Sequence, residues 1–424
     1  MELNLSNIQG NVVPGFSKDH QAFVFVHVRD GETGRAWLRA LQAEIASAEE
    51  VSAFNSLFSK LRARRSENPE PDNGVLGVLA ATWVNIAWSF RGLQVLRGAR
   101  ETERFPATFK SNRIAASPAY PRADDVHALV IVASDQTDDL EAELLRQRLR
   151  LTAFGVEEVT CLRGETLSGE LRGHEHFGFK DGISQPRIAG TDFGDGFPVA
   201  AGEFVVGHAD QEGQHNVEGL PDWVRDGSYL VFHQLQQHVG VFGTEMRHAA
   251  QQLGMSVDAI KAGIVGRCPD GTPVQPSSRL SHISRGFAQW LPAAQSARHR
   301  LIRRGIPYGT RLAEGERDDG DRGLLFVAYQ ADIARQFEHV WSQWINGSNF
   351  PLPGAGADLL VGQSDGPPRR AASLIPAGQS GGLSSLSVPA FVTPRYGGYF
   401  FAPGIEALSQ LATNATSVYA KGRE

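Results

Sequence analysis

The stretch HALVIVA at residues 127–133, followed by TDDLEAELLRQRLRL at residues 137–151, forms the clearest strand and helix pattern of this sequence. The first stretch is a continuous apolar run, rich in β-branched residues, with the length of a buried strand. The second has apolar residues at helical spacing, and Asp135 is expected to cap the helix. A β-strand leading directly into an amphipathic helix is therefore the starting point for the N-terminal half.

Outward from this pair, the pattern of alternating or clustered apolar residues predicts further elements on both sides. We expect strands at residues 21–29, 75–88 and 156–162, a long helical region over 34–65, and a short helix over 90–96. The resulting order, β-α-β followed by β-α-β, is that of a ferredoxin-like unit, an antiparallel sheet with helices on one face.

The C-terminal half has a related order of predicted elements. We expect strands at 203–207, 228–232, 323–329 and 396–402, and helices at 236–252, 255–266, 331–345 and 404–411. The Gly-, Pro- and Ser-rich segment 354–388 is expected to be a long surface excursion. These patterns predict an α+β protein with two domains, 1–200 and 201–424.

The composition of the 424 residues is that of an ordinary globular protein, with 41% hydrophobic and 21% charged residues. A net charge of −6 gives no electrostatic reason to expect nucleic acid or an anionic membrane as a partner. Cys161 and Cys268 are too few for a disulfide framework, which favours a reducing compartment and hence the cytoplasm. The N-terminus resembles no secretory signal, and no apolar run is long enough for a membrane helix.

The run HFGFKDGISQP at residues 176–186 carries the most chemical information. It places the carboxylate of Asp181 between Gly178 and Gly182, where glycine lets the backbone approach a large ligand. Apolar neighbours are expected to bury Asp181 and raise its pKa toward an acid–base range, namely Phe177, Phe179 and Ile183. The run therefore predicts a loop with one acid–base residue beside a bound group.

This run and several others together resemble the dye-decolorizing peroxidases, a family of haem enzymes. The motifs are NIQGN at 7–11, GFKDG at 178–182, RRGIPYG at 303–309, GLLF at 323–326 and PRYGGYFF at 394–401. The resemblance spans nearly the whole chain and implies two ferredoxin-like units in a dimeric α+β barrel, with haem held mainly by the C-terminal half. It also implies one non-covalent haem b per chain, hydrogen peroxide as oxidant, and dyes, phenols or other aromatic compounds as one-electron reductants.

The resemblance further implies roles for individual residues. His282 is at the position of the iron ligand, and Arg303 at that of the arginine that assists Asp181 with peroxide. The other residues expected to surround the haem are Gly178, Phe179, Gly182, Ile183, Arg285, Leu324, Phe326 and Asp358, the last as the partner of the second ring nitrogen of His282. The sequence departs from the family after His282, where it reads ISRGFA, so that Arg285 is left to neutralise a propionate. It departs again at Gly305, where some members have asparagine.

Other interpretations of the same residues stay open at this point. The arginines at 298–304 also fit a solvated basic face, Asp358 fits a loop cap, and Leu324 and Phe326 fit ordinary core packing. The whole chain also fits a haem carrier without turnover. A non-haem metal site of His174, His176 and Asp181 requires an extended segment 174–176.

Trp290, Tyr329, Trp341 and Trp344 are candidates to pass electrons from large dyes to the haem. The sequence selects none of them, and it is equally compatible with a monomer and a homo-oligomer.

Overall fold

The N-terminal half forms a ferredoxin-like unit, as the sequence predicts. The computed structural model describes residues 3–67, 80–112, 125–273, 296–313, 315–350, 356–363, 369–371 and 386–413. The strands of this unit are β1 (His20–His27), β2 (Thr82–Trp88), β3 (Ala128–Ser134) and β4 (Glu157–Glu165). They pair in the order β4-β1-β3-β2, and every pair is antiparallel. The helices are α1 (Gly31–Leu41), η1 (Gln42–Glu44), α2 (Ala48–Glu67), α4 (Phe90–Arg97), α5 (Ala99–Thr102), α6 (Ala107–Ser111) and α7 (Thr137–Phe154).

The C-terminal half repeats this topology without a visible sequence repeat. Its elements are β7 (Ser228–Gln237), α8 (Val239–Leu253), α9 (Val257–Val265), β8 (Ile302–Arg303), β9 (Ile306–Tyr308), β10 (Gly323–Gln330), the π-helical turns η6 (Ala334–Glu338) and η7 (Val340–Ile345), β13 (Val392–Ala402) and α12 (Ile405–Leu411). The sheet order β13-β7-β10-β8 is the order of the first unit, with the last strand beside the first. The expected pair of ferredoxin-like units is therefore confirmed.

The two units join into one sheet that curls into a barrel. The pair Phe401 and Trp88 links β13 to β2, so the strands of the two units form one continuous antiparallel sheet. Its two ends, β4 and β9, also meet, because a Cβ added at Gly164 would lie 2.3 Å from Ile306 Cγ2. Alternate residues of the strands fill the interior and face away from the helices. Examples of this interior set are Phe23, Phe25, Leu129, Ile131, Phe232, Leu325, Val327, Tyr396 and Phe400.

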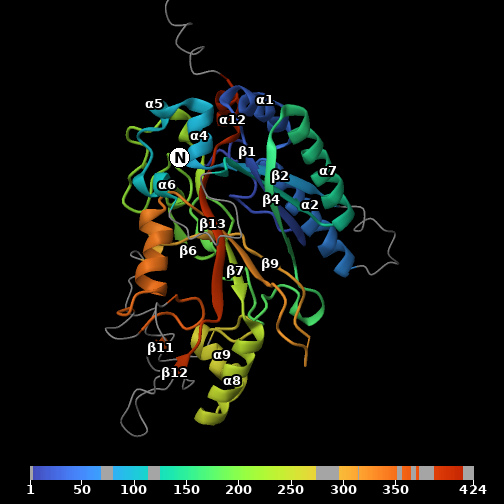
Figure 1. Ribbon diagram of the computed structural model, residues 1–424, viewed down its shortest axis with the longest axis vertical. Coiled ribbons are helices and arrows are strands. Elements are labelled where there is room, and N and C mark those ends of the chain that lie inside the picture. The colour runs from blue at the N-terminus through green and yellow to red at the C-terminus, as the bar shows by residue number, and fades with distance from the viewer. Residues whose placement is uncertain are drawn as a thin grey trace, which may run out of the picture.

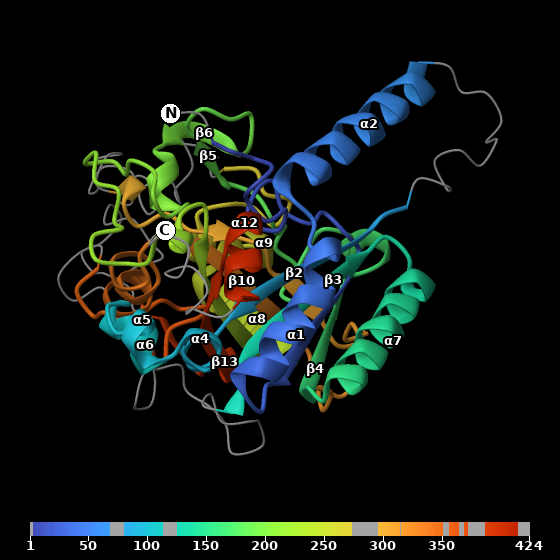
Figure 2. The ribbon, with the colours of Figure 1, turned by 90° about the horizontal axis from the view of Figure 1, so that it is seen from above.

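Helices cover the outer face of the sheet (Figure 1). Helices α1 and α7 lie side by side over the N-terminal strands, and α2 projects from the body of the molecule (Figure 2). Helices α8 and α9 lie together at the far end of the C-terminal strands (Figure 1). No helix in the described parts of the chain combines the length and the apolar character that crossing a bilayer requires.

The connection between the units holds the loop of Asp181. It contains η3 (Gly169–Leu171), β5 (Pro186–Ile188), β6 (Asp195–Val199), η4 (Ala201–Glu203) and η5 (Asp222–Val224), of which β5 and β6 pair in parallel. The predicted domain boundary at residue 200 falls within this connection and stays a prediction.

Several local predictions are wrong for reasons of tertiary contact. The predicted strand at 203–207 is a 3-10 turn followed by bends, in which the N–H groups of Phe204 and Val205 donate to Ala201 O. The predicted cap, Asp135, does not cap α7; its carboxylate accepts instead from Lys18 Nζ and from Ala81 N–H. The helix expected over 34–65 is interrupted after residue 44, where the chain forms bridges to other segments.

The expected surface excursion at 354–388 is only partly described. Its strands β11 (Arg369–Ala371) and β12 (Leu386–Val388) pair with each other. Leu359 and Val388 are buried in an apolar cluster with α8, so these parts are packed against the body. The start of the strand expected at 75–88 lies outside the described residues, and β2 begins at Thr82.

Candidate active site

The loop with Asp181 is closed by backbone hydrogen bonds rather than by regular structure. Asp181 N–H donates to Gly173 O at 2.9 Å, and Lys180 N–H donates to Pro269 O at 2.8 Å. Gly178 and Gly182 both have positive φ, 89° and 74°, which only glycine adopts without strain. The two glycines that the sequence singled out are therefore required by the backbone of the loop.

The aromatic residues of the loop anchor it and do not cover Asp181. The rings of Phe177 and Phe179 pack against Phe242 of α8, with centroid distances of 4.4 and 6.2 Å. The side chain of Asp181 is exposed. The expected burial of Asp181 among apolar neighbours is thus wrong, because those rings turn into the cluster on α8.

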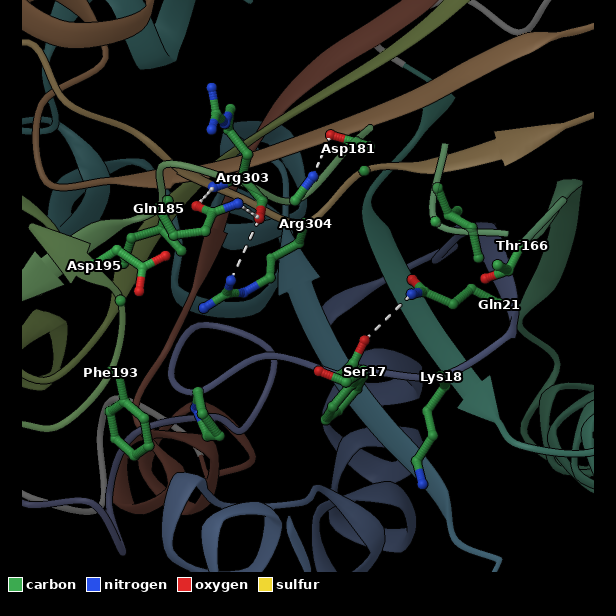
Figure 3. A pocket seen from close by; sticks show the side chains of 18 of the residues that line it. Ser17, Lys18, Gln21, Thr166, Asp181, Gln185, Phe193, Asp195, Arg303 and Arg304 are labelled. Atoms are coloured by element: carbon green, nitrogen blue, oxygen red, sulfur yellow. Dashed lines mark hydrogen bonds between the residues drawn. The ribbon is translucent and has the colours of Figure 1, made fainter. Parts of the chain in front are cut away.

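Arg303 reaches the same loop from β8. Its Nη2 donates to Ile183 O at 2.6 Å. Its guanidinium also interacts electrostatically with the negative charge of Asp181. Asp181 and Arg303 both line a cavity of about 700 Å³ (Figure 3). Residues 122 positions apart, 303 − 181, are therefore brought to one wall, as the sequence predicts.

Gln185 fastens the two segments together, a role that sequence reasoning missed. Its Oε1 accepts from Arg303 N–H at 3.1 Å, and its Nε2 donates to Arg303 O at 3.0 Å (Figure 3). Arg267 holds the same loop from the other side, since its Nη2 donates to Ser184 Oγ at 2.7 Å. Gln185 belongs to the quoted HFGFKDGISQP run, so the signal was present, but only the fold shows its partner.

Leu324 and Phe326 lie on the outer face of β10. Leu324 Cδ1 is 3.6 Å from the position of a Cβ at Gly305, and Gly305 lines the cavity. Phe326 packs against the cluster that also contains Phe179 and Leu359. The loop, β10 and the turn after Asp358 are thus neighbours, as expected for residues around one bound group.

The remaining predicted residues are only partly described. His282 and Arg285 lie in the segment 274–295, outside the described residues. Asp358 Oδ1 accepts from Leu360 N–H at 3.0 Å and from Val361 N–H at 2.8 Å. Asp358 therefore caps its own turn, and its contact with His282 stays a prediction.

The alternative non-haem site is not assembled. His176 is buried, and its Nε2 lies 2.9 Å from Tyr308 O, whereas His174 Nδ1 lies 3.2 Å from Arg172 O. The segment turns at Glu175, where Gly178 N–H donates to Glu175 O, so it is not extended. Within the described ranges, no group of three His, Cys, Asp or Glu side chains could hold a metal ion.

Comparison with known proteins identifies the family. A model of the DyP dimeric alpha+beta barrel domain matches residues 7–166, and a model of the C-terminal part of Dyp-type peroxidases matches residues 175–350. The chain belongs to the dye-decolorizing peroxidase family. It is therefore a hydrogen-peroxide-dependent peroxidase that acts on dyes, of a family whose cofactor is haem.

Relatives match over nearly the full length. A dye-decolorizing peroxidase of Mycetinis scorodonius is 28% identical, over 96% of this chain and 87% of its own. The solved structure of an ancestral D-type dye-decolorizing peroxidase is 27% identical, with a TM-score of 0.79, over 97% of this chain and 100% of that chain. The structure of a single-residue mutant of the dye-decolorizing peroxidase from Pleurotus ostreatus is 25% identical, with a TM-score of 0.80 and the same coverage.

The aromatic side chains around His233 include two that remain open to a bound group. His233 pairs with Phe326 across β7 and β10, is buried, and has no hydrogen-bond partner for either ring nitrogen among the described residues. Burial lowers its pKa to about 3, so the ring is neutral. Phe326 and Trp341 beside it keep partly exposed side chains. Partly exposed aromatic rings beside a buried apolar cluster fit a flat, largely apolar cofactor such as haem.

Proposed function

We propose that this chain is a haem b peroxidase in which Asp181 and Arg303 act together on hydrogen peroxide. One haem per chain would be held without a covalent bond, because the sequence has no CxxCH motif for thioether attachment. His282 would supply the iron ligand, and Phe179, Leu324 and Phe326 the apolar contacts. The observation that carries the proposal is the meeting of Asp181 and Arg303 on one cavity wall.

Haem supplies the redox chemistry, since iron can take two oxidising equivalents from peroxide and pass them on singly. The protein supplies the proton transfer. Asp181, as an exposed carboxylate, takes the proton from one oxygen of peroxide and returns it to the other oxygen, which leaves as water. Its side chain is exposed and lines the cavity, so that it can reach peroxide there.

Arg303 stabilises the negative charge that develops on the departing oxygen. Its guanidinium stays cationic and is held by Ile183 O, which leaves further N–H donors for peroxide. Gly305 brings no side chain to this wall, where some family members have asparagine. Asp181 and Arg303 therefore carry the proton transfer and the charge stabilisation in this chain.

The size of the cavity suggests two routes for reducing substrates, one for small molecules and one for large dyes. A cavity of about 700 Å³, lined in part by Phe16, Ile188 and Phe193, suits small phenols or other single-ring reductants. Large dyes would instead give up electrons at the protein surface.

Among the three candidates that the structure describes, we propose Trp344 for that transfer. It contacts the stacked pair His299 and His339 at 5.3 and 5.6 Å and stacks on Phe350 at 5.1 Å. Three residues before it on the same π-helical segment, Trp341 stacks on Phe337, which contacts Phe326. Tyr329 is buried inside the barrel, and Trp290 lies outside the described residues. Trp344 therefore lies in one aromatic cluster, and Trp341, on the same helical segment, lies in a second cluster that reaches Phe326.

The cytoplasm is the proposed compartment, and the two free cysteines, Cys161 and Cys268, support it.

An absorption spectrum of the haem-reconstituted protein, before and after one equivalent of hydrogen peroxide, tests the proposal. The wild type should show a Soret band that changes on addition of peroxide, and Asp181→Asn should slow that change by roughly 100-fold or more. His282→Ala should lose or shift the band. A haem spectrum that does not respond to peroxide would instead identify a haem carrier, and a missing Soret band would contradict haem binding.

A further inference from the structure

The loop that carries Asp181 is wrapped around a carboxylate that has no part in the chemistry above. Glu175 Oε2 accepts from Phe177 N–H at 3.0 Å, and Glu175 Oε1 accepts from Phe179 N–H at 2.9 Å. The same turn is closed by Glu175 N–H donating to Phe179 O at 3.0 Å. One side chain thus satisfies two backbone donors of the turn with charge-assisted hydrogen bonds.

The carboxylate also ties the turn to the C-terminal unit. Gln237, the last residue of β7, donates from Nε2 to Glu175 Oε2. Lys261 of α9 donates from Nζ to Phe177 O at 3.0 Å, and its positive charge acts on Glu175. The turn is therefore held between strand β7 and helix α9.

Glu175 and Asp181 are close enough to interact electrostatically. Burial raises the pKa of Glu175, and the charge of Asp181 adds to this rise, whereas the hydrogen bonds from Phe177, Phe179 and Gln237 work against it. Phe179, the last residue that Glu175 holds, precedes Asp181 by two positions. A shift of the turn would thus move Asp181 directly.

We propose that Glu175 is a positioning residue, which fixes the turn 175–179 on β7 and α9 and so places the Asp181 carboxylate for proton transfer with peroxide. This rests on the proposed role of Asp181. Small misplacements of a catalytic group cost large factors in rate, so the expected effect lies in the peroxide step.

The test uses the holoenzyme and follows the peroxide-induced spectral change by stopped flow. Glu175→Ala leaves two N–H donors of the turn without a partner, and should slow the bimolecular reaction by at least about tenfold. Glu175→Gln should slow it less, because the unpaired Oε1 of Gln237 can turn to accept from the new amide. Glu50→Ala is the matched control, since Glu50 Oε2 accepts from Ser47 N–H and Oγ–H, both at 2.8 Å, at the start of α2.

The double variant with Asp181→Asn separates positioning from general stability. In that background, Glu175→Ala should change the rate by less than about twofold, because the group it positions is gone. A folded Glu175→Ala holoenzyme within about twofold of wild type would overturn the proposal, as would an undiminished effect in the Asp181→Asn background. If Glu175→Ala does not fold, Glu175→Gln is used in its place. Its peroxide rate is compared with that of wild type and with that of the same variant in the Asp181→Asn background. A wild type and Glu50→Ala that both fail to react with peroxide would overturn the proposed function itself.

Discussion

Replacing Gln185 by alanine should slow the reaction with peroxide although Gln185 carries no charge and transfers no proton. Its side chain makes two hydrogen bonds to the backbone of Arg303, one accepted at 3.1 Å and one donated at 3.0 Å. Each such bond contributes about 0.5–1.5 kcal/mol, and the partly exposed position places the pair at about 1–2 kcal/mol in total. If that free energy holds Arg303 in its working position, its loss lowers the rate roughly 5- to 30-fold.

Stopped-flow measurement of the peroxide-induced change in the Soret band gives this rate directly. Gln343→Ala is the matched control, because Gln343 is exposed and, among the described residues, its side chain bonds only to its neighbour Ser342 at 3.4 Å. The wild type and Gln343→Ala should agree, and both should react faster than Gln185→Ala. A Gln185→Ala rate equal to that of the control would contradict this explanation, and Arg303 would then be held by β8 and Ile183 alone.

Three further outcomes are expected. Gly164→Val should lower the free energy of unfolding by about 1–3 kcal/mol, because the new side chain collides with Ile306 where the barrel closes, and an unchanged Tm would mean that these edges do not pack. Burial alone would raise the pKa of Asp210, but the hydrogen bond from Arg335 and three others lower it from 3.8 to about 2. The stabilisation from Asp210 is therefore present above about pH 4 and is lost as the pH falls toward about 2. Asp210→Asn should cost about 2 kcal/mol at neutral pH and flatten that part of the acid dependence in urea titrations. Trp344→Ser should reduce oxidation of a bulky dye while leaving that of a small phenol intact, and equal losses for both substrates would exclude surface transfer through this residue.

Much of the fold could be predicted from local pattern. The apolar run at 127–133 forms β3, and the strongly apolar run at 323–329 forms β10, each within one residue of the predicted bounds. Runs of this kind are buried wherever they lie, so their conformation depends little on distant residues. The prediction for segment 203–207 is wrong, and here tertiary contacts are present: Glu203 ends a 3-10 turn and is buried in an ion pair with Arg335.

The candidate site could be predicted in its parts but not in its assembly. Asp181, Arg303, Leu324 and Phe326 were identified from motifs. The structure places Asp181 and Arg303 on one cavity and packs Phe326 against the apolar cluster that contains Phe179. The exposure of Asp181 was not foreseen, because the direction in which Phe177 and Phe179 turn depends on Phe242 of α8.

The fold class, the family and most of the long strands and helices could be read from the chain alone, since they follow from local periodicity and from motifs, and the same motifs gave the candidate site residues. How the loop of Asp181 is held became visible only in the folded molecule. The carboxylate of Glu175, the amide of Gln185 and the guanidinium of Arg267 all lie near this loop, yet their partners include residues up to 118 positions away. A hydrogen bond depends on the distance and direction between two atoms, and for residues far apart in the chain both are fixed only when the sheet closes.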